Sequence, residues 1–428
     1  MKDLRKTIGL NVSVCLCLAL TARADVVSDW NTIAIQAITT SVPPRPPGGS
    51  SFLDIAMVQL AVHNAVAAFD GQFRPYYRAI PGAAGSPVAA VAKAAHDVLV
   101  NRFPAQTASL GTIYSNYLAA NLLSPNDPGV AVGRQAAADI IALRANDGSF
   151  PSPEPPPFIG GTGIGVWRPT PPAFAPMATP WLGKVKPFAL NHPAQFLAKP
   201  PPALNSGLYA RDYNEVKDLG SLTNSKRTSQ QTEVAYFWAA NHLVIWNQVL
   251  RELASAQSLN LGKSARLFAL VNMAMADAAI TSWNTKSHYV SWRPITAIQN
   301  GDNDSNPKTV GDPVWQPLIV TPPYPDHSSG ASNVTGAATR ILRHFFGRNE
   351  MTFSVTTNNM MAVQKTRTYR HFSDAAQEVV DARVYEGIHF RFADADGRSQ
   401  GESVAKWTFK HFLRPVKDDG DDDEDDDR

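Results

Sequence analysis

Apolar residues recur at helical spacing along most of the chain. The clearest stretch, SFLDIAMVQLAVHNAVAAFD at 51–70, stops at Asp70-Gly71, and a glycine commonly ends a helix. No run of alternating β-branched residues is long enough to predict a sheet. The sequence therefore predicts an all-α fold. The same spacing predicts further helices at about 84–103, 107–123, 130–147, 228–255, 263–284, 328–347, 373–386 and 397–412.

One long segment departs from this pattern. Residues 149–205 contain SPEPPP, GGTGIG, WRPTPPAFAP and KPPPAL, and so many prolines exclude long helices. We expect an irregular, Pro-rich excursion packed on the surface of a single helical domain. That domain would span 25–417, with N-terminal helices in 50–148 and a second set of helices in 228–414.

Several large side chains on the predicted helices are interpreted as core residues. His63 lies on the apolar stripe of the first long helix, where a buried structural histidine is the more common role. Phe237, Trp238 and Trp246 lie on the apolar positions of 228–255. We interpret all three as core residues.

The N-terminus has the pattern of an export signal. Lys2, Arg5 and Lys6 precede an apolar run from 8 to 20, which is too short to span a bilayer, and Ala22-Arg23-Ala24 offers a cleavage site. Residues 1–24 are therefore predicted to be a signal peptide, and the mature protein to be secreted or periplasmic without an integral membrane segment. An uncleaved anchor is the alternative. Both cysteines lie inside this segment, which excludes disulfides and thiolate chemistry from the mature chain.

Charge is distributed unevenly over the chain. Residues 418–428 carry nine acids and one base, whereas 25–417 hold 34 Lys and Arg against 27 Asp and Glu. We predict a disordered acidic tail, with weak calcium binding or docking on the basic body as alternatives. No basic stripe with interleaved aromatic residues indicates nucleic-acid binding.

Three short blocks in the last third of the chain carry candidate chemistry. The first is KSHYVSWRP, the second PPYPDHSSGAS and the third DARVYEGIHF. Together they supply three cations, a hydroxyl, a glycine N–H and an imidazole, which are the groups that bind a tetrahedral oxyanion. Each block alone has a structural explanation, such as a helix N-cap or a surface arginine. The candidate residues are Lys286, Arg293, Ser329, Gly330, Arg383 and His389.

The spacing within the blocks adds geometric expectations. Pro294 disfavours helical geometry at Arg293, which should therefore end its segment. Ser329 and Gly330 precede an Ala/Thr-rich run and should lie at a helix N-terminus, where anions are favoured. Arg383 and His389 are six residues apart and cannot share a helix face, so a break is expected at Gly387.

The three blocks resemble the signature of the vanadium-dependent haloperoxidase and type 2 phosphatidic acid phosphatase superfamily. That signature reads Lys-x6-Arg-Pro, Pro-Ser-Gly-His and Ser-Arg-x5-His, and the flanking sequence is similar to an exported bacterial branch. The resemblance implies a helical bundle that holds vanadate, or phosphate in its place. Lys286, Arg293, Ser329, Gly330 and Arg383 would bind the oxyanion. His389 would be the axial vanadium ligand, or the nucleophile of a phosphatase.

One residue departs from the signature. The family's acid–base histidine corresponds to Ala331 here, and general acid–base catalysis is typically worth about 10²–10⁴-fold. His327, four residues upstream, is the candidate substitute. The hypothesis is a haloperoxidase-like enzyme that oxidises halide with hydrogen peroxide, slowly if no group replaces the histidine. The alternatives are an acid phosphatase acting on a phosphate ester and a non-catalytic oxyanion-binding relative.

Overall fold

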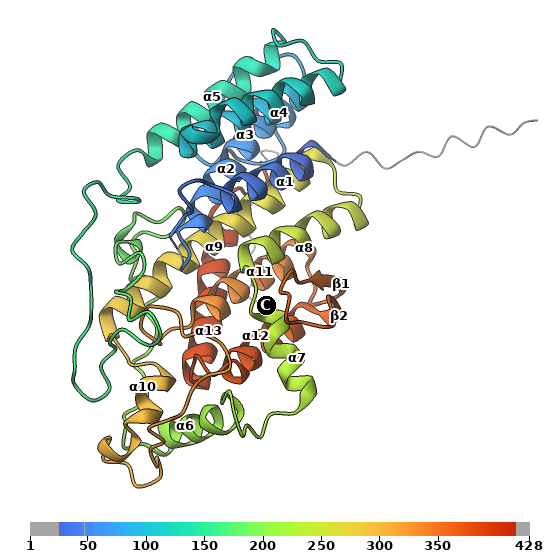
Figure 1. Cartoon of the computed structure of the whole chain (residues 1–428). Helices are drawn as coiled ribbons and strands as arrows, with labels where there is room; N and C mark the ends of the chain where they lie inside the picture. Colours follow the sequence, from blue (N-terminus) through green and yellow to red (C-terminus); the bar gives the residue numbers. More distant parts are fainter. Residues whose placement is uncertain (1–24, 47, 417–428) are drawn as a thin grey trace, which may run out of the picture.

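The computed structural model describes residues 25–46 and 48–416. The predicted signal peptide and acidic tail lie outside the described residues. Figure 1 shows an elongated arrangement in which α1–α5 lie at one end, α6 and α10 lie at the other, and α9 runs between the two halves. The first half comprises α1 (Val26–Thr39), α2 (Ser51–Asp70), α3 (Pro87–Arg102), α4 (Thr107–Ala120) and α5 (Pro128–Arg144).

The second half carries the three sequence blocks. Its elements are α6 (Gly207–Leu219), α7 (Ser229–Trp238), α8 (His242–Ala256), α9 (Leu261–Tyr289), α10 (Pro294–Gln299), α11 (Gly330–Phe346), β1 (Glu350–Thr356), β2 (Thr366–His371), α12 (Phe372–Tyr385) and α13 (Arg391–His411). The all-α prediction is confirmed, because the described sheet is one two-stranded hairpin.

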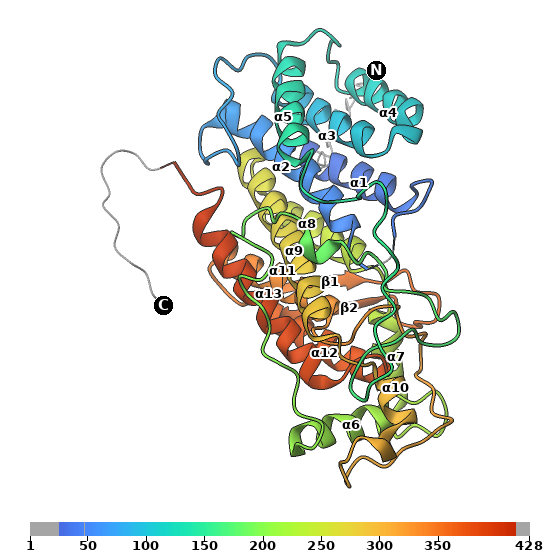
Figure 2. The ribbon, with the colours of Figure 1, turned by 90° about the vertical axis from the view of Figure 1, so that its left-hand side faces the viewer.

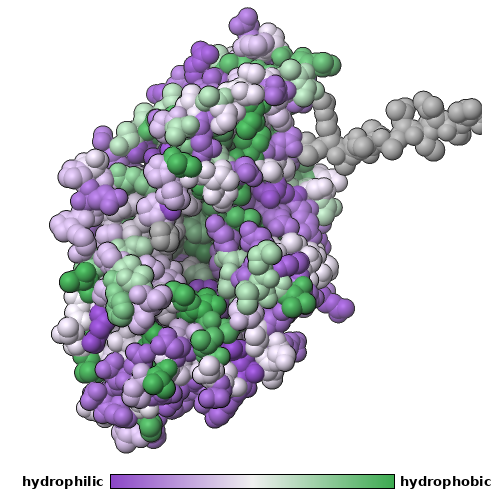
Figure 3. Space-filling model, in the orientation of Figure 1, coloured by the Kyte–Doolittle hydropathy of each residue, from purple (hydrophilic) through white to green (hydrophobic). Residues whose placement is uncertain are grey.

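Two helices form the centre of the molecule, because both are buried on nearly every face. The 29-residue α9 packs against α2 in one half and against α11 and α13 in the other. Helix α2 is long and apolar enough to cross a membrane, but 83% of its most apolar stretch is buried, as in the core helix of a globular protein. The outer surface differs from this interior, because Figure 3 shows hydrophilic and hydrophobic residues mixed over the face in view.

The side chains interpreted as core residues lie inside the protein. His63 of α2 is 1% exposed, with Nε2 3.0 Å from the Arg74 carbonyl oxygen. Phe237, Trp238 and Trp246 are buried as well. The core interpretation of all four residues is therefore confirmed.

Two features of the second half differ from the prediction. The run 228–255 is predicted as one helix, but it breaks between α7 and α8, since the Asn241 side chain caps α8 by accepting from the Leu243 N–H at 3.0 Å. Asn359 also donates to two backbone carbonyls where α7 ends. The expectation of no sheet is wrong as well, because β1 and β2 form a short antiparallel hairpin that pairs Phe353 with Tyr369.

The Pro-rich excursion is irregular, as predicted, apart from one 3-10 turn at Leu182–Lys184. It is fixed to the core by Asp277 of α9. The Asp277 carboxylate accepts three backbone N–H groups, from Phe188, Ala189 and Leu190, at 2.6, 2.7 and 3.0 Å. Burial raises the pKa of Asp277 to about 6. The excursion is thus held by a carboxylate inside the protein.

Close packing of α11 on α13 positions the second and third sequence blocks. A Cβ at Gly401 would overlap the backbone oxygen of Asn333, and one at Gly336 would overlap the backbone of Arg398. Only glycine permits this approach. Figure 2 shows the two helices side by side. The N-terminus of α11, where Ser329 lies, is therefore fixed against the start of α13.

Candidate oxyanion site

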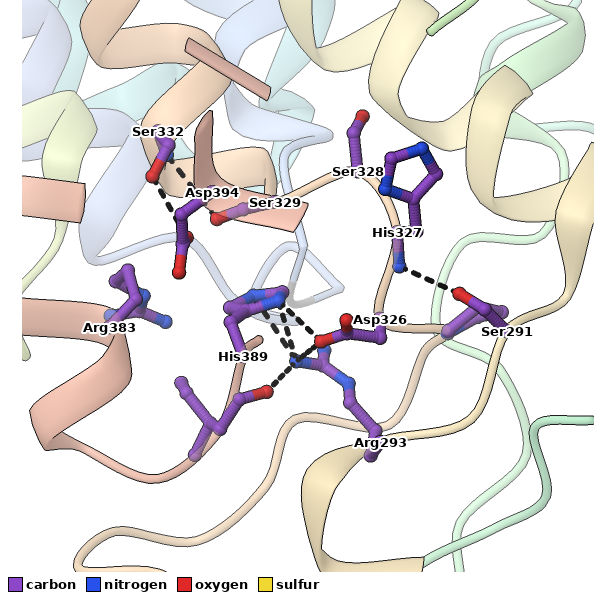
Figure 4. Close-up of polar contacts among 12 residues, drawn as sticks. Ser291, Arg293, Asp326, His327, Ser328, Ser329, Ser332, Arg383, His389 and Asp394 are labelled. Atoms are coloured by element: carbon purple, nitrogen blue, oxygen red, sulfur yellow. Dashed lines mark hydrogen bonds and ion pairs between the residues drawn. The ribbon is translucent and has the colours of Figure 1, made fainter. Parts of the chain in front are cut away.

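The three sequence blocks meet at one buried place between the ends of several helices (Figure 4). Lys286 lies in the last turn of α9, and Arg293 is the N-cap residue of α10. Ser329 caps α11, and Arg383 lies in the last turn of α12. His389 follows in the loop before α13, because Gly387 adopts a φ of 79° and interrupts the helix, as the spacing predicted.

Lys286 joins the end of α9 to the loop that precedes α11. Its side chain is 0% exposed, and Nζ donates to the carbonyls of Pro325 and Asp326 at 2.7 and 2.9 Å. Burial, followed by the charge of Arg293, holds the pKa of Lys286 well below its usual range. An ammonium has three N–H groups, so one donor remains for an anion, whose charge would favour the protonated form.

Arg293 spans the second and third blocks. Its Nε donates to the Tyr324 carbonyl at 2.7 Å and its Nη1 donates to the Ile388 carbonyl at 2.6 Å. The same Nη1 lies 3.1 Å from Nε2 of His389. Nη2 is buried and has no partner among the described residues. A buried, unpaired guanidinium nitrogen is costly, and an anion would satisfy it.

Arg383 contributes the third cation. Its Nη1 lies 2.6 Å from Oε2 of Glu386, whereas its Nε is buried without a partner in the described part of the chain. Burial raises the pKa of Glu386 to about 8. Near neutral pH much of this carboxyl is therefore uncharged, which leaves the charge of Arg383 available to an anion.

The N-terminus of α11 supplies the neutral donors. Ser329 Oγ accepts from the Ser332 N–H at 3.5 Å, and the Ser329 N–H donates to the Ala393 carbonyl at 2.9 Å. Gly330 is the first residue of α11, at the end where helix N–H groups lack intrahelical acceptors. A Cβ at Gly330 would stand 3.1 Å from the Trp283 ring, so the close fit against α9 favours glycine.

His389 is oriented by a residue that sequence reasoning missed. Its Nδ1 lies 2.8 Å from Oδ1 of Asp326, and both side chains are buried. Burial, followed by Arg293, holds the pKa of His389 well below its usual range. A carboxyl group on one ring nitrogen directs the other toward a ligand, so Nε2 is the nitrogen suited to coordinate or attack.

Two further carboxyl groups line the site. Burial raises the pKa of Asp326 to about 8 and that of Asp394 to about 7. Asp394 Oδ1 accepts from Ser332 Oγ at 2.9 Å. Asp326 lies inside the second block and Glu386 inside the third, but position alone does not separate a carboxyl group of the site from a solvated one.

His327 is placed differently from the other candidates. Its Nε2 lies 2.7 Å from the Lys199 carbonyl oxygen, and its ring packs near those of Tyr289 and Phe392. Figure 4 shows the ring turned away from His389 and Arg293. The structure therefore groups six candidates and leaves the His327 imidazole aside, although its backbone belongs to the same loop. Its catalytic role stays a prediction.

Comparison with known proteins finds a matching family profile and similar solved structures. A family profile described as the VCPO second helical-bundle domain matches residues 266–418. A solved bacterial vanadium-dependent iodoperoxidase is 25% identical, with a TM-score of 0.76 over 92% of this chain and 97% of that chain. These matches support the vanadium haloperoxidase superfamily for this chain. The resemblance found in the three blocks is thereby confirmed.

Two further relatives are covered over less of their length or are less identical in sequence. The vanadium chloroperoxidase of Curvularia inaequalis is 24% identical over 286 residues, which cover 51% of this chain and 46% of that protein. The chain thus matches less than half of this curated relative. A holo-type bacterial vanadium-dependent chloroperoxidase has a TM-score of 0.70 at 17% identity, covering 85% of this chain and 91% of that chain, which shows the shared fold.

The site fits a tetrahedral oxyanion. The unpartnered Arg293 Nη2 and Arg383 Nε are strong donors, and Lys286 retains a third N–H. The imidazole of His389 is the group that could bond to vanadium or phosphorus. Vanadate and phosphate share shape and charge, so these N–H groups can donate to the oxygens of either anion.

Proposed function

We propose that the chain is a vanadate-dependent haloperoxidase that oxidises halide with hydrogen peroxide. The observation that carries the proposal is the convergence of three buried cations, two with unpartnered nitrogens, on the imidazole of His389. The names of the superfamily relatives, an iodoperoxidase and chloroperoxidases, favour this reaction over phosphate-ester hydrolysis.

The roles of the residues follow from their contacts. Lys286, Arg293 and Arg383 would neutralise the oxyanion, while Ser329 and the Gly330 N–H would donate to its oxygens. His389, with Asp326 at Nδ1, would bond to the central atom of the oxyanion through Nε2. Bound vanadate would supply the Lewis acid that activates hydrogen peroxide. The site is buried, since Lys286, Arg293 and His389 are each at most 1% exposed. Burial strengthens the charge interactions within the site.

Halide oxidation and phosphatase assays test the proposal on the same preparation. The protein is stripped of metal, loaded with orthovanadate, and assayed for vanadium content, for iodide and bromide oxidation by hydrogen peroxide, and for hydrolysis of an aryl phosphate. Vanadate-dependent halide oxidation is expected, with inorganic phosphate acting as a competitor. Hydrolysis without halide oxidation would instead support the phosphatase, and tight anion binding without either reaction would support the non-catalytic relative.

We also propose that the protein is exported after cleavage behind Ala24, because residues 1–24 have the basic, apolar and small-residue pattern of a signal peptide. N-terminal sequencing of secreted or periplasmic protein should begin at Asp25. Mature protein that begins at Met1 would contradict the proposal.

A further inference from the structure

The first turn of α11 lacks the imidazole that the superfamily signature has there. Ala331 places a methyl group at that position. Residues four apart on a helix share a face, so the next side chain along the same face is Thr335. A side chain that contacts Thr335 therefore lies about one helical turn from the position of the missing imidazole.

A histidine from a different helix contacts Thr335. His242 is the first residue of α8, and its Nδ1 lies 3.3 Å from Thr335 Oγ1. Trp246 Nε1 donates to the same hydroxyl at 3.1 Å. The imidazole also stacks on Trp238, with ring centroids 5.9 Å apart and planes inclined by 20°. The ring of His242 is thus held by its Nδ1 edge and one face.

The other nitrogen of this ring is unused. His242 is 9% exposed, and its buried Nε2 has no hydrogen-bond partner among the residues described. Buried polar groups are nearly always paired, and an exception requires an explanation such as a bound ligand or a catalytic role. Neither the packing of the fold nor the set of oxyanion ligands accounts for this nitrogen.

Arg383 links His242 to the oxyanion site. Burial lowers the pKa of His242 to about 3, and the charge of Arg383 acts in the same sense. Arg383 is thus close enough for its charge to act on the ring, and it presents an unpartnered Nε to the anion.

We propose that His242 is the acid–base residue of this site, exchanging a proton at Nε2 in place of the imidazole absent at position 331. The inference rests on the proposed function. Hydrogen peroxide would lose a proton to Nε2. Halide would then lose two electrons as the O–O bond breaks, and the departing oxygen would leave as water after taking the proton back. With one further proton from solvent, peroxide and halide become hypohalous acid and water.

The charge state of His242 depends on the anion at the site. In the protein alone the imidazole is neutral near pH 7, so Nε2 can accept a proton. An oxyanion at Arg383 would offset the guanidinium charge and raise the pKa of His242, which stabilises the protonated ring. His327 is placed less favourably, since its Nε2 is engaged by the Lys199 carbonyl and its ring is turned away from His389 and Arg293.

The first test follows His242 directly, without turnover. Histidine-labelled protein is titrated by NMR over pH with and without saturating inorganic phosphate, and the His242 resonance is assigned with the His242→Gln variant. Phosphate should raise the pKa of His242 by about one unit or more. His344, near the other end of α11 with Nε2 3.0 Å from Arg340 Nε, is the internal control and should not respond.

The second test separates proton transfer from binding. His242→Gln keeps a polar side chain but cannot be protonated, so vanadate-dependent halide oxidation should fall by about 10²–10⁴-fold. Phosphate affinity should change by less than about tenfold, because the three cations remain. Ala331→His in the His242→Gln background should restore much of the rate. The control variant His344→Gln should keep it.

The outcomes distinguish this inference from the proposed function. Wild-type protein that binds neither phosphate nor vanadate overturns the proposed function and the inference with it. Wild-type protein that binds phosphate without any response at His242 overturns the inference alone. Three results of the halide-oxidation assay would also overturn the inference alone. The first is a rate in His242→Gln that equals a high wild-type rate, and the second is a wild-type rate as low as that of His242→Gln. The third is loss of activity in His327→Ala while His242→Gln keeps it.

Discussion

The substitution Arg293→Lys tests whether the geometry of the guanidinium, beyond its charge, builds the oxyanion site. Arg293 uses three nitrogens in three directions: Nε on the Tyr324 carbonyl, Nη1 on the Ile388 carbonyl, and Nη2 without a partner in the described chain. Lysine keeps the charge but offers one ammonium at a single point. It can therefore replace only one of these roles.

The size of the effect follows from the hydrogen bonds that lysine cannot make. Hydrogen bonds from charged donors contribute roughly 1.5–3 kcal/mol each. Arg293→Lys should remove one of two such bonds to backbone carbonyls, lowering the free energy of unfolding by about 1.5–3 kcal/mol. If the ammonium goes to a carbonyl, the anion is left without its Nη2 donor, and oxyanion affinity should fall roughly 10–100-fold.

Calorimetric titration with phosphate and orthovanadate measures the affinity, and denaturant unfolding measures the stability. The matched control is Arg398→Lys on α13, where the guanidinium contacts Glu402 and Gln377 at the surface and a small effect is expected. If folded Arg293→Lys binds phosphate as tightly as Arg398→Lys does, Arg293 is not an oxyanion ligand and the assigned site is wrong at its centre.

Three further variants test other parts of the site. His389→Ala should abolish halide oxidation while phosphate still binds in calorimetry, because the cations remain; full turnover would make His389 structural. Sulfate affinity should fall as pH rises from about 6 to 9. The pKa values of Asp394, Asp326 and Glu386 are raised to about 7, 8 and 8, so three carboxylates that oppose an anion form in this window, and that of Glu386 forms beside Arg383. In Glu386→Gln this pH dependence should flatten, and an unchanged profile would remove Glu386 from the explanation. Gly401→Ala should lower the free energy of unfolding by roughly 2–4 kcal/mol, because its Cβ would overlap Asn333; an unchanged melting temperature would show that α11 and α13 can separate at little cost.

The sequence predicts the local geometry of the site well, because local rules determine it. Gly387 is predicted to break the chain between Arg383 and His389, and it does so with a positive φ. Ser329 is predicted at a helix N-terminus and is the N-cap of α11. The 51–70 pattern matches α2 to the residue, since Gly71 ends that helix in the left-handed conformation.

Long-range contacts were beyond reach of the sequence. His242 contacts a hydroxyl 93 residues away, and its position in an apolar run indicated only burial. The contact of Asp326 with His389 joins different blocks in the same way. Among elements, α1, α6 and α10 were not predicted. The hairpin was missed because its strands are short and are stabilised by packing on α8 and α12, which a local pattern does not report.

The carbonyl groups held by Lys286 and Arg293 have a consequence for handling the protein. The loops at 324–326 and 388 keep their shape through hydrogen bonds with these side chains, so the receptor is preorganised by the protein itself. Removal of a bound oxyanion should therefore leave a folded apo-protein, which should bind vanadate again without refolding. One preparation of the protein could then be loaded with different oxyanions in turn, without a refolding step.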